Sequence, residues 1–340
     1  ALLASWDDEV LSQALEHLKD PVLNFDIELT GFDLAGADRI IDAQRFEEPS
    51  NPRDDEFAPK SKIQSRCQTG HIWQLGPHKL ICGDARDPEV IRQLMAGEAA
   101  RMVFTDPPYN VAIKGNVSGL GKISHNDFVM ACGEMSKDGF TSFLNTSFQN
   151  MATHSMDGSI HFICMDWRHL SEMQAAAEGI FTELKNLIVW VKDNGGMGSF
   201  YRSRHELIFC YKQGTAPHVN TFELGQHGRY RTNAWEFRGV NSRGSNRHEE
   251  LAMHPTVKPV QMISEAIKDV SYRGDIVLDI FAGSGSTLIA AEKTKRTARV
   301  CELDPRYCDQ ILDRWERYTN DRVECIYSLT IFPTNEGVEQ

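Results

Sequence analysis

The chain has 340 residues, 41% of them hydrophobic and 25% charged, which is typical of a soluble globular protein with one or two domains. No apolar run approaches the roughly 20 residues needed to span a bilayer, and the basic start of a signal peptide is missing, so we expect a cytoplasmic protein without membrane contact. Eight cysteines without a Cys-x-x-Cys pair indicate reduced thiols and predict neither disulfides nor a metal site.

The first 60 residues are strongly acidic, since their 15 acidic and 5 basic side chains account for −10 of the net charge of −12. Residues 5–19 have leucines at helical spacing, with Ser5 as the expected N-cap, and residues 25–46 contain a second helical pattern. Three prolines then punctuate a stretch that we interpret as a linker. We expect residues 1–60 to form a helical appendage, for packing or for binding a partner, on a catalytic domain spanning 61–340. Because the chain begins with alanine, we also expect it to be processed or part of a longer protein.

From residue 70 onward, short apolar runs alternate with helical patterns. The predicted strands lie at residues 80–82, 102–105, 159–164, 187–191, 207–211, 276–280 and 298–301, and residues 71–75 form a hairpin with the first of them. The predicted helices lie at residues 87–96, 137–151, 168–178, 257–270, 286–294 and 305–318. This alternation predicts an α/β fold with an open, doubly wound, seven-stranded and mostly parallel sheet.

The first chemical motif, Asp106-Pro107-Pro108-Tyr109, directly follows an apolar strand. Two prolines fix the backbone and donate no hydrogen bond, so they force a rigid turn at the carboxyl end of the strand, where open α/β sheets bind ligands. The turn presents a carboxylate, unpaired carbonyl groups and an aromatic ring. These groups suit the amino group and the face of a heterocycle.

The second motif runs from Asp279 to Thr287 and joins a strand to a helix through Gly283 and Gly285. Such a turn binds nucleotides, yet Leu288 replaces the third glycine of a dinucleotide site and no Gly-Lys-Ser/Thr is present. Glu302, 19 residues beyond Gly283, is placed to bind ribose hydroxyls. A ligand with a ribose, a cationic amino-acid part and no phosphate fits this set, and S-adenosyl-L-methionine is such a ligand.

In this order the motifs resemble those of the β-class amino-directed DNA methyltransferases, over about residues 70–320. There the Asp-Pro-Pro-Tyr element precedes the Phe-x-Gly-x-Gly element, a circular permutation of the common order, and the fold is a Rossmann-like S-adenosylmethionine-dependent methyltransferase. The resemblance implies that the catalytic residues are Asp106, Pro107, Pro108 and Tyr109. It implies cofactor contacts by Asp84, Ala85, His254, Lys258, Asp279, Phe281, Gly283, Gly285, Ser286, Thr287, Glu302 and Leu303. The acidic N-terminal part resembles the spacer after a ParB-like domain in longer phage and bacterial methylases.

The resemblance implies a site-specific DNA methyltransferase acting on N6 of adenine in duplex DNA, without a metal. Asp106 and a neighbouring carbonyl would accept both N–H bonds of the amine, and Tyr109 would stack on a base flipped out of the duplex. The charged acceptor at position 106 favours adenine, since cytosine-directed relatives more often carry serine there. An N4-cytosine methyltransferase, an RNA or protein methyltransferase and a non-catalytic DNA-binding protein remain alternatives. A homodimer and a cognate restriction enzyme are compatible with the sequence.

DNA contacts are expected in residues 213–253, where the family inserts its target-recognition region. Residues 201–247 hold eight basic groups against three acids, a local charge of +5. The arginines expected to contact DNA are Arg229, Arg231, Arg238, Arg243 and Arg247. Residues 111–136 are expected to form a mobile loop that closes over the flipped base.

Overall fold

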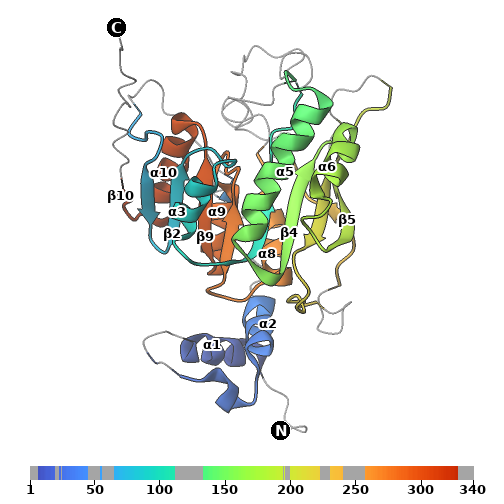
Figure 1. Ribbon diagram of the computed structural model, residues 1–340. Helices are drawn as coiled ribbons and strands as arrows, with labels where there is room; N and C mark the ends of the chain where they lie inside the picture. The colour runs from blue at the N-terminus through green and yellow to red at the C-terminus, as the bar shows by residue number, and fades with distance from the viewer. Residues whose placement is uncertain are drawn as a thin grey trace.

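A sheet with helices on both faces forms the body of the protein (Figure 1). The computed structural model describes residues 7–19, 23, 25–44, 54–55, 65–111, 133–193, 195, 200–222, 230–239 and 257–327. Within these residues the sheet has 10 strands in the order β10-β1-β2-β9-β8-β3-β4-β6-β5-β7. In chain order they are β1 (Ile72–Leu75), β2 (His78–Cys82), β3 (Ala100–Thr105), β4 (Ser155–Met165), β5 (Glu183–Val191), β6 (His205–Lys212), β7 (Ala234–Glu236), β8 (Ile276–Asp279), β9 (Thr297–Glu302) and β10 (Glu324–Tyr327).

The seven predicted strands are all present, but the predicted strand number is wrong. The hairpin strand β1 belongs to the same sheet, and the short edge strands β7 and β10 extend it. β10 is exposed at every position and β7 is only 3 residues long, so neither has the hydrophobic pattern that would have revealed it. The central strands β2, β9, β8, β3 and β4 pair in parallel, and the antiparallel pairs lie toward the edges.

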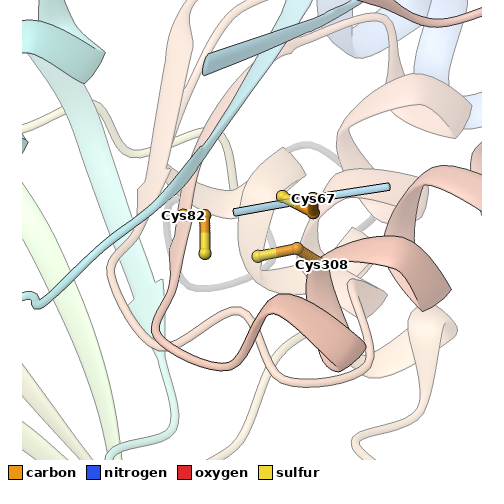
Figure 2. A group of neighbouring side chains, drawn as sticks. All are labelled: Cys67, Cys82 and Cys308. Atoms are coloured by element: carbon orange, nitrogen blue, oxygen red, sulfur yellow. The ribbon is translucent and has the colours of Figure 1, made fainter. Parts of the chain in front are cut away.

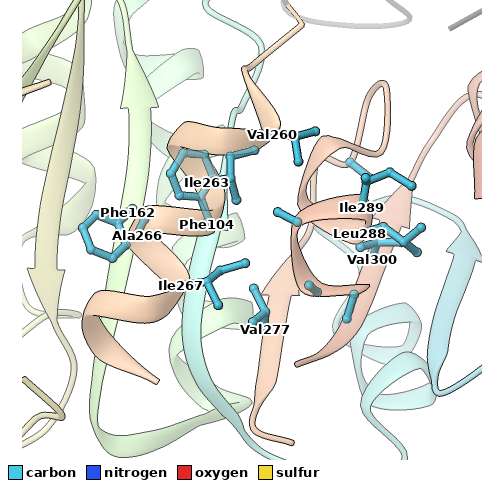
Figure 3. Close-up of a cluster of buried hydrophobic side chains, with 14 of the residues drawn as sticks. Phe104, Phe162, Val260, Ile263, Ala266, Ile267, Val277, Leu288, Ile289 and Val300 are labelled. Carbon is cyan, nitrogen blue, oxygen red and sulfur yellow. The ribbon is translucent and has the colours of Figure 1, made fainter. Parts of the chain in front are cut away.

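Two hydrophobic clusters, one on each face of the sheet, hold the helices in place. On one face α3 (Pro88–Met95), α5 (Lys137–Thr153) and α6 (Leu170–Ala177) pack over residues such as Val103 and Ile163. On the other face lie α8 (Val260–Val270), α9 (Ser286–Thr294) and α10 (Pro305–Thr319). Figure 3 shows Phe104 and Phe162 of the sheet against Ile263 of α8 on this second face. The doubly wound arrangement that the sequence predicted is therefore present.

This topology places four predicted site segments side by side. β2, β9, β8 and β3 are neighbours and run parallel, so their carboxyl ends lie at one edge of the sheet. Gly83-Asp84 follows β2, Glu302 ends β9, Asp279 ends β8 and Asp106 follows β3. Ligands of open α/β sheets bind at this edge.

The N-terminal appendage is helical, as predicted. It contains α1 (Asp8–Leu18), a short 3₁₀ turn at Ile27–Thr30 and α2 (Leu34–Gln44), which share a small apolar core. Asp7 caps α1, whereas Ser5, the predicted cap, lies outside the described residues. The permuted motif order, the spacer resemblance and the boundary at residue 60 stay predictions.

Ion pairs dock the appendage onto the edge of the sheet opposite the predicted site. Arg273, just before β8, donates to Asp42 at 3.0 Å and, through its backbone N–H, to Asp38 at 3.0 Å. Arg296, just before β9, is almost fully buried and donates to Asp42 at 3.2 Å. Because partly buried ion pairs are screened less by solvent than exposed ones, these contacts fix the position of α2.

Asp54 and Asp55, in the predicted linker, also contact helices of the α/β body. The Asp55 carboxylate accepts a hydrogen bond from the backbone N–H of Val260, the first residue of α8, at 3.0 Å. The carbonyl of Asp54 accepts from Arg314 at 2.7 Å, and its carboxylate pairs with Lys293. These two residues are therefore packed against the α/β body.

Candidate active site

A single cavity brings most of the predicted site residues together at the carboxyl edge of the central strands. Its lining includes the predicted catalytic residues Asp106, Pro107, Pro108 and Tyr109. It also includes the predicted cofactor residues Asp84, Ala85, Lys258, Asp279, Phe281, Gly283, Ser286, Thr287, Glu302 and Leu303. The two motifs that the sequence predicted separately therefore face one space.

The turn after β3 holds a carboxylate and a phenol in direct contact. The hydroxyl of Tyr109 donates to Oδ1 of Asp106 at 2.6 Å and also lies 3.2 Å from Oε2 of Glu206. Burial, followed by the negative charges of Asp106 and Glu206, raises the pKa of Tyr109 well above its ordinary value, so the phenol stays protonated. Asp106 thus keeps one oxygen toward Tyr109.

Lys258 occupies the other oxygen of Asp106. Its buried Nζ lies 2.5 Å from Oδ2 of Asp106 and 3.1 Å from Oε2 of Glu206. Sequence reasoning placed Lys258 with the cofactor, but the structure shows it bridging two carboxylates beside the reactive turn. The ammonium group also lies 5.5 Å from the centre of the Tyr109 ring.

Glu206 and Lys192 are the functional candidates that sequence reasoning missed. Glu206 lies near the start of β6, and it pairs with Lys192 as well as with Lys258. β6 runs antiparallel to β4, so its amino end reaches the same edge of the sheet as the carboxyl end of β3. A charged residue flanking a predicted strand was the only available signal.

The charged groups of this cluster shift the pKa values of Asp106, Glu206 and Lys258 in different directions. Burial raises the pKa of Asp106, and the neighbouring charge of Glu206 adds to the rise, while Lys258 opposes it. Burial also disfavours the charged Glu206, but Lys258 and Lys192 together lower its pKa to about 2. Although burial opposes its charge, Asp106 and Glu206 raise the pKa of Lys258 above its ordinary value. Lys258 is thus a permanent cation between the two carboxylates.

The other end of the cavity contains two carboxylates that are held by neutral donors. Asp279 accepts from the hydroxyl of Thr105 at 2.8 Å and from the backbone N–H of Phe281 at 3.1 Å. Glu302 accepts from the backbone N–H of Gly283 at 2.8 Å and of Asp304 at 2.9 Å. No ion pair to either carboxylate occurs within the described part of the chain.

Burial without a cation raises the pKa of both groups. Desolvation raises the pKa of Asp279 to about 6 and that of Glu302 to about 7, despite the hydrogen bonds that each accepts. Such carboxylates gain from a ligand that brings positive charge or hydroxyl donors. This end of the cavity therefore suits the cationic and ribose parts of S-adenosylmethionine.

The glycine turn between β8 and α9 shapes this end. Gly283 and Gly285 have φ angles of 51° and 77°, which side chains other than glycine rarely adopt. A Cβ at Gly285 would also meet Cγ1 of Ile311 at 3.1 Å. Gly285 itself does not line the cavity, so its place in the structure is conformational, whereas Gly283 lies at the surface of the cavity.

Not every predicted residue can be placed. His254, Arg229, Arg243 and Arg247 lie outside the described residues, as does most of the predicted mobile loop. Arg231 pairs with Asp269 at 3.1 Å and stacks over Trp235, whereas Arg238 is exposed. DNA contacts by these arginines stay predictions.

Asn110 ties the two ends of the predicted mobile loop together. With φ at 52°, it follows the catalytic turn, and its Oδ1 accepts from the backbone N–H groups of Gly133 and Met135 at 3.0 and 3.2 Å. Its amide group donates to the carbonyl of Met135 at 2.9 Å. The chain thus leaves and rejoins the domain beside Asp106.

This geometry agrees with a match to known proteins. Residues 100–313, more than half of the chain, match the family N6_N4_Mtase, described as DNA methylase. The chain belongs to this family. Membership makes the protein a DNA methyltransferase and supports S-adenosylmethionine as its cofactor, as the sequence predicted.

Individual methylases are related more distantly. The chain is 25% identical over 258 residues to the type II methyltransferase M1.MboII of Moraxella bovis, covering 68% of this chain and 93% of that protein. It is 26% identical over 250 residues to the DNA adenine methyltransferase YhdJ of Escherichia coli strain K12, covering 64% and 76%.

Solved methyltransferase structures share the fold. The M1.HpyAVI–SAM complex superposes with a TM-score of 0.51 at 20% identity, covering 69% of this chain and 97% of that one. The cytosine-N4-specific PvuII DNA methyltransferase superposes with a TM-score of 0.50 at 14% identity, covering 72% and 93%. In the described part of this methylase, no helix is both long and apolar enough to cross a membrane.

Proposed function

We propose that this DNA methylase transfers the methyl group of S-adenosylmethionine to N6 of adenine in duplex DNA. One observation carries the proposal: Asp106 and Tyr109 lie in contact and line the same cavity as Asp279 and Glu302. A base held at the first pair would face a cofactor held at the second. Positioning of this kind supplies much of the acceleration in group transfer.

The residues at the cofactor end fit the proposed ligand. Asp279 would pair with its cationic amino-acid part, and Glu302 would accept hydrogen bonds from its ribose hydroxyls. When bound, S-adenosylmethionine supplies an electrophilic methyl group on a sulfonium. The helix α9 begins at this end, so its free N–H groups complete the polar wall.

At the acceptor end, Asp106 has the central role. The lone pair of an exocyclic amine is delocalised into its ring, so an acceptor that binds its N–H bonds frees it for attack. Asp106 accepts one such bond, and a carbonyl of the proline turn accepts the other. After transfer the nitrogen carries an extra proton, which Asp106 is placed to take because burial raises its pKa.

A charged acceptor favours adenine over cytosine, for which serine is the more frequent residue at this position in the resembling family. The N4-cytosine reaction is the second candidate, because the matched family covers both acceptors and PvuII methyltransferase shares the fold. Flipping of the base, the loop after Val111 as its lid and residues 213–253 as the recognition region belong to the same proposal. The type II relatives favour a role beside a restriction enzyme.

The test uses the full chain, duplex DNA and S-adenosylmethionine labelled in its methyl group. We expect label in N6-methyl-2′-deoxyadenosine after digestion to nucleosides, and loss of that label in Asp106→Ala with cofactor binding retained. The matched control is Asp166→Ala. Asp166 follows the neighbouring strand β4, where it caps a short turn and pairs with Arg168, and the variant should keep activity. Label confined to N4-methyl-2′-deoxycytidine would overturn the adenine assignment, and label retained in Asp106→Ala would overturn the role of Asp106.

A further inference from the structure

Three cysteines far apart in sequence meet behind the cofactor end of the cavity. Cys67 precedes β1, Cys82 ends β2 and Cys308 lies in the first turns of α10, and Figure 2 shows their sulfur atoms pointing toward one another. All three side chains are buried, and their Sγ atoms lie within 4.8 Å of one another. No sequence pattern predicted this cluster, because none of the three belongs to a Cys-x-x-Cys pair.

The three thiols interact with one another and with the backbone. Sγ of Cys82 lies 3.8 Å from the carbonyl of Leu303, and Sγ of Cys308 lies 3.5 Å from the carbonyl of Glu302. Three converging sulfur atoms offer three of the four ligands that a tetrahedral zinc site needs.

A candidate for a fourth ligand, His71, lies opposite Cys82 just before β1. The carbonyl of His71 accepts a hydrogen bond from the N–H of Cys82 across the antiparallel β1–β2 pair, so the two side chains project from the same face of the sheet. Nδ1 of His71 is buried and makes no hydrogen bond within the described residues. A buried imidazole nitrogen without a partner is costly unless something binds it.

We propose that Cys67, Cys82 and Cys308 form a structural zinc site, and that the His71 ring turns in as the fourth ligand when the metal binds. Three thiolates and one imidazole are a common tetrahedral set for Zn²⁺, with Zn–S distances of about 2.3 Å and hence sulfur–sulfur distances of about 3.8 Å. The sulfur atoms already lie within 4.8 Å of one another, so small rotations of the three cysteine side chains bring them to this spacing, whereas His71 has to move farther. Binding releases the thiol protons to solvent and involves no change of oxidation state.

The site would connect segments that the sheet alone does not join. Cys67 lies in the strand-free segment before β1, Cys82 in the central sheet and Cys308 in α10. The same cysteines contact the backbone of Glu302 and Leu303, which line the cofactor cavity. A metal ion here would therefore stabilise the fold and hold the cofactor end of the cavity in shape. The inference does not depend on which base is methylated.

The test measures metal binding by the reduced, full-length protein after removal of metal with a chelator. Zn²⁺ is titrated in competition with a coloured chelator, and Co²⁺ serves as the spectroscopic probe, since thiolate-to-cobalt bands report sulfur ligands. We expect one tight zinc ion per chain and strong thiolate bands. Because even an outer-shell change costs roughly 10–100-fold in metal affinity, His71→Ala and Cys308→Ser should each cost at least that much.

Cys210→Ser is the matched control, because Cys210 is also buried but lies on β6, away from the cluster. It should bind zinc as the parent does. If Cys308→Ser does not fold, the intensity of the thiolate bands in the parent and in His71→Ala decides the question. Zinc binding no tighter in the parent than in Cys308→Ser, parent cobalt spectra without thiolate bands, or a disulfide between two of the three cysteines in the parent would overturn the proposal.

Discussion

The two ends of the active-site cavity differ in how the charge of their buried carboxylates is compensated. At the acceptor end, Asp106 and Glu206 share a cation, Lys258, that is itself buried. At the cofactor end, Asp279 and Glu302 are held by backbone N–H groups and a threonine hydroxyl. The acceptor end is charge-compensated by the protein, whereas the cofactor end gains its compensation from a ligand.

The difference has a thermodynamic consequence. A charge that the protein compensates stabilises the fold, and removing its partner is costly. A carboxylate that is buried without a cation costs stability above its pKa, and that cost is offset only when a ligand binds. Lys258 and Glu302 should therefore respond to mutation with opposite signs.

The largest expected effect comes from Lys258→Met. The change leaves two buried carboxylates without their shared cation, so the free energy of unfolding should fall by about 3–5 kcal/mol at pH 7. Urea denaturation measures it. The matched control is Lys185→Met, an exposed lysine paired with Glu183, for which the loss should stay below about 1 kcal/mol. Equal losses in both variants would contradict the compensation by Lys258.

The second effect concerns Glu302→Gln and has the opposite sign. The pKa of about 7 in the folded state lies above the ordinary value for glutamate, so the folded protein binds the proton more readily than the unfolded chain. The parent therefore loses stability as the pH rises toward and through 7, whereas glutamine does not titrate. Between pH 5 and pH 8 the stability of the variant relative to the parent should increase by roughly 2–3 kcal/mol.

Urea denaturation at the two pH values tests this expectation in protein without cofactor. Glu178→Gln, at an exposed position after α6, is the control and should follow the parent at both pH values. Calorimetry should show weaker S-adenosylmethionine binding by Glu302→Gln, because a carboxylate accepts stronger hydrogen bonds than an amide. A pH-independent stability difference would show that Glu302 is already compensated.

The smallest effect is expected for Glu206→Gln. This change removes the negative charge that raises the pKa of Asp106, so that pKa should fall. The acid limb of the pH–rate profile should then move to lower pH by up to about one unit, with cofactor affinity unchanged. Exposed Glu183 provides the control, as Glu183→Gln should leave the profile in place. If the acid limb does not move, the charge of Glu206 does not raise the pKa of Asp106 in the active enzyme.

The sequence was sufficient for the parts of the site that follow parallel strands. Asp84, Asp106, Asp279 and Glu302 each come at or just after the end of an apolar run, and neighbouring parallel strands bring such positions to one edge. The sequence alone thus predicts that these side chains lie close together at one edge of the sheet. The central strands were predicted for the same reason, since runs buried on both faces are continuously apolar.

The remainder depended on topology that no local pattern encodes. Glu206 reaches the site because β6 runs antiparallel to β4. The residues of a strand do not reveal its direction relative to its neighbours. Cys67 and Cys308 are 241 positions apart, so only the folded chain shows that they meet. The edge strand β10 forms through backbone pairing with β1. All of its side chains are exposed, so no hydrophobic pattern predicts it.

The contact between Asp55 and Val260 bears on how such a chain could exchange parts with others. Pro259 cannot cap α8 with its own side chain. Asp55, 205 positions before Val260, supplies the missing acceptor, and Val260 is only two residues beyond Lys258. The helix that follows the active-site lysine is thus completed by the acidic segment that precedes the enzyme. A recombination joint at residue 60 would separate the helix from its cap, whereas a joint before Asp54 would carry the cap along with the enzyme.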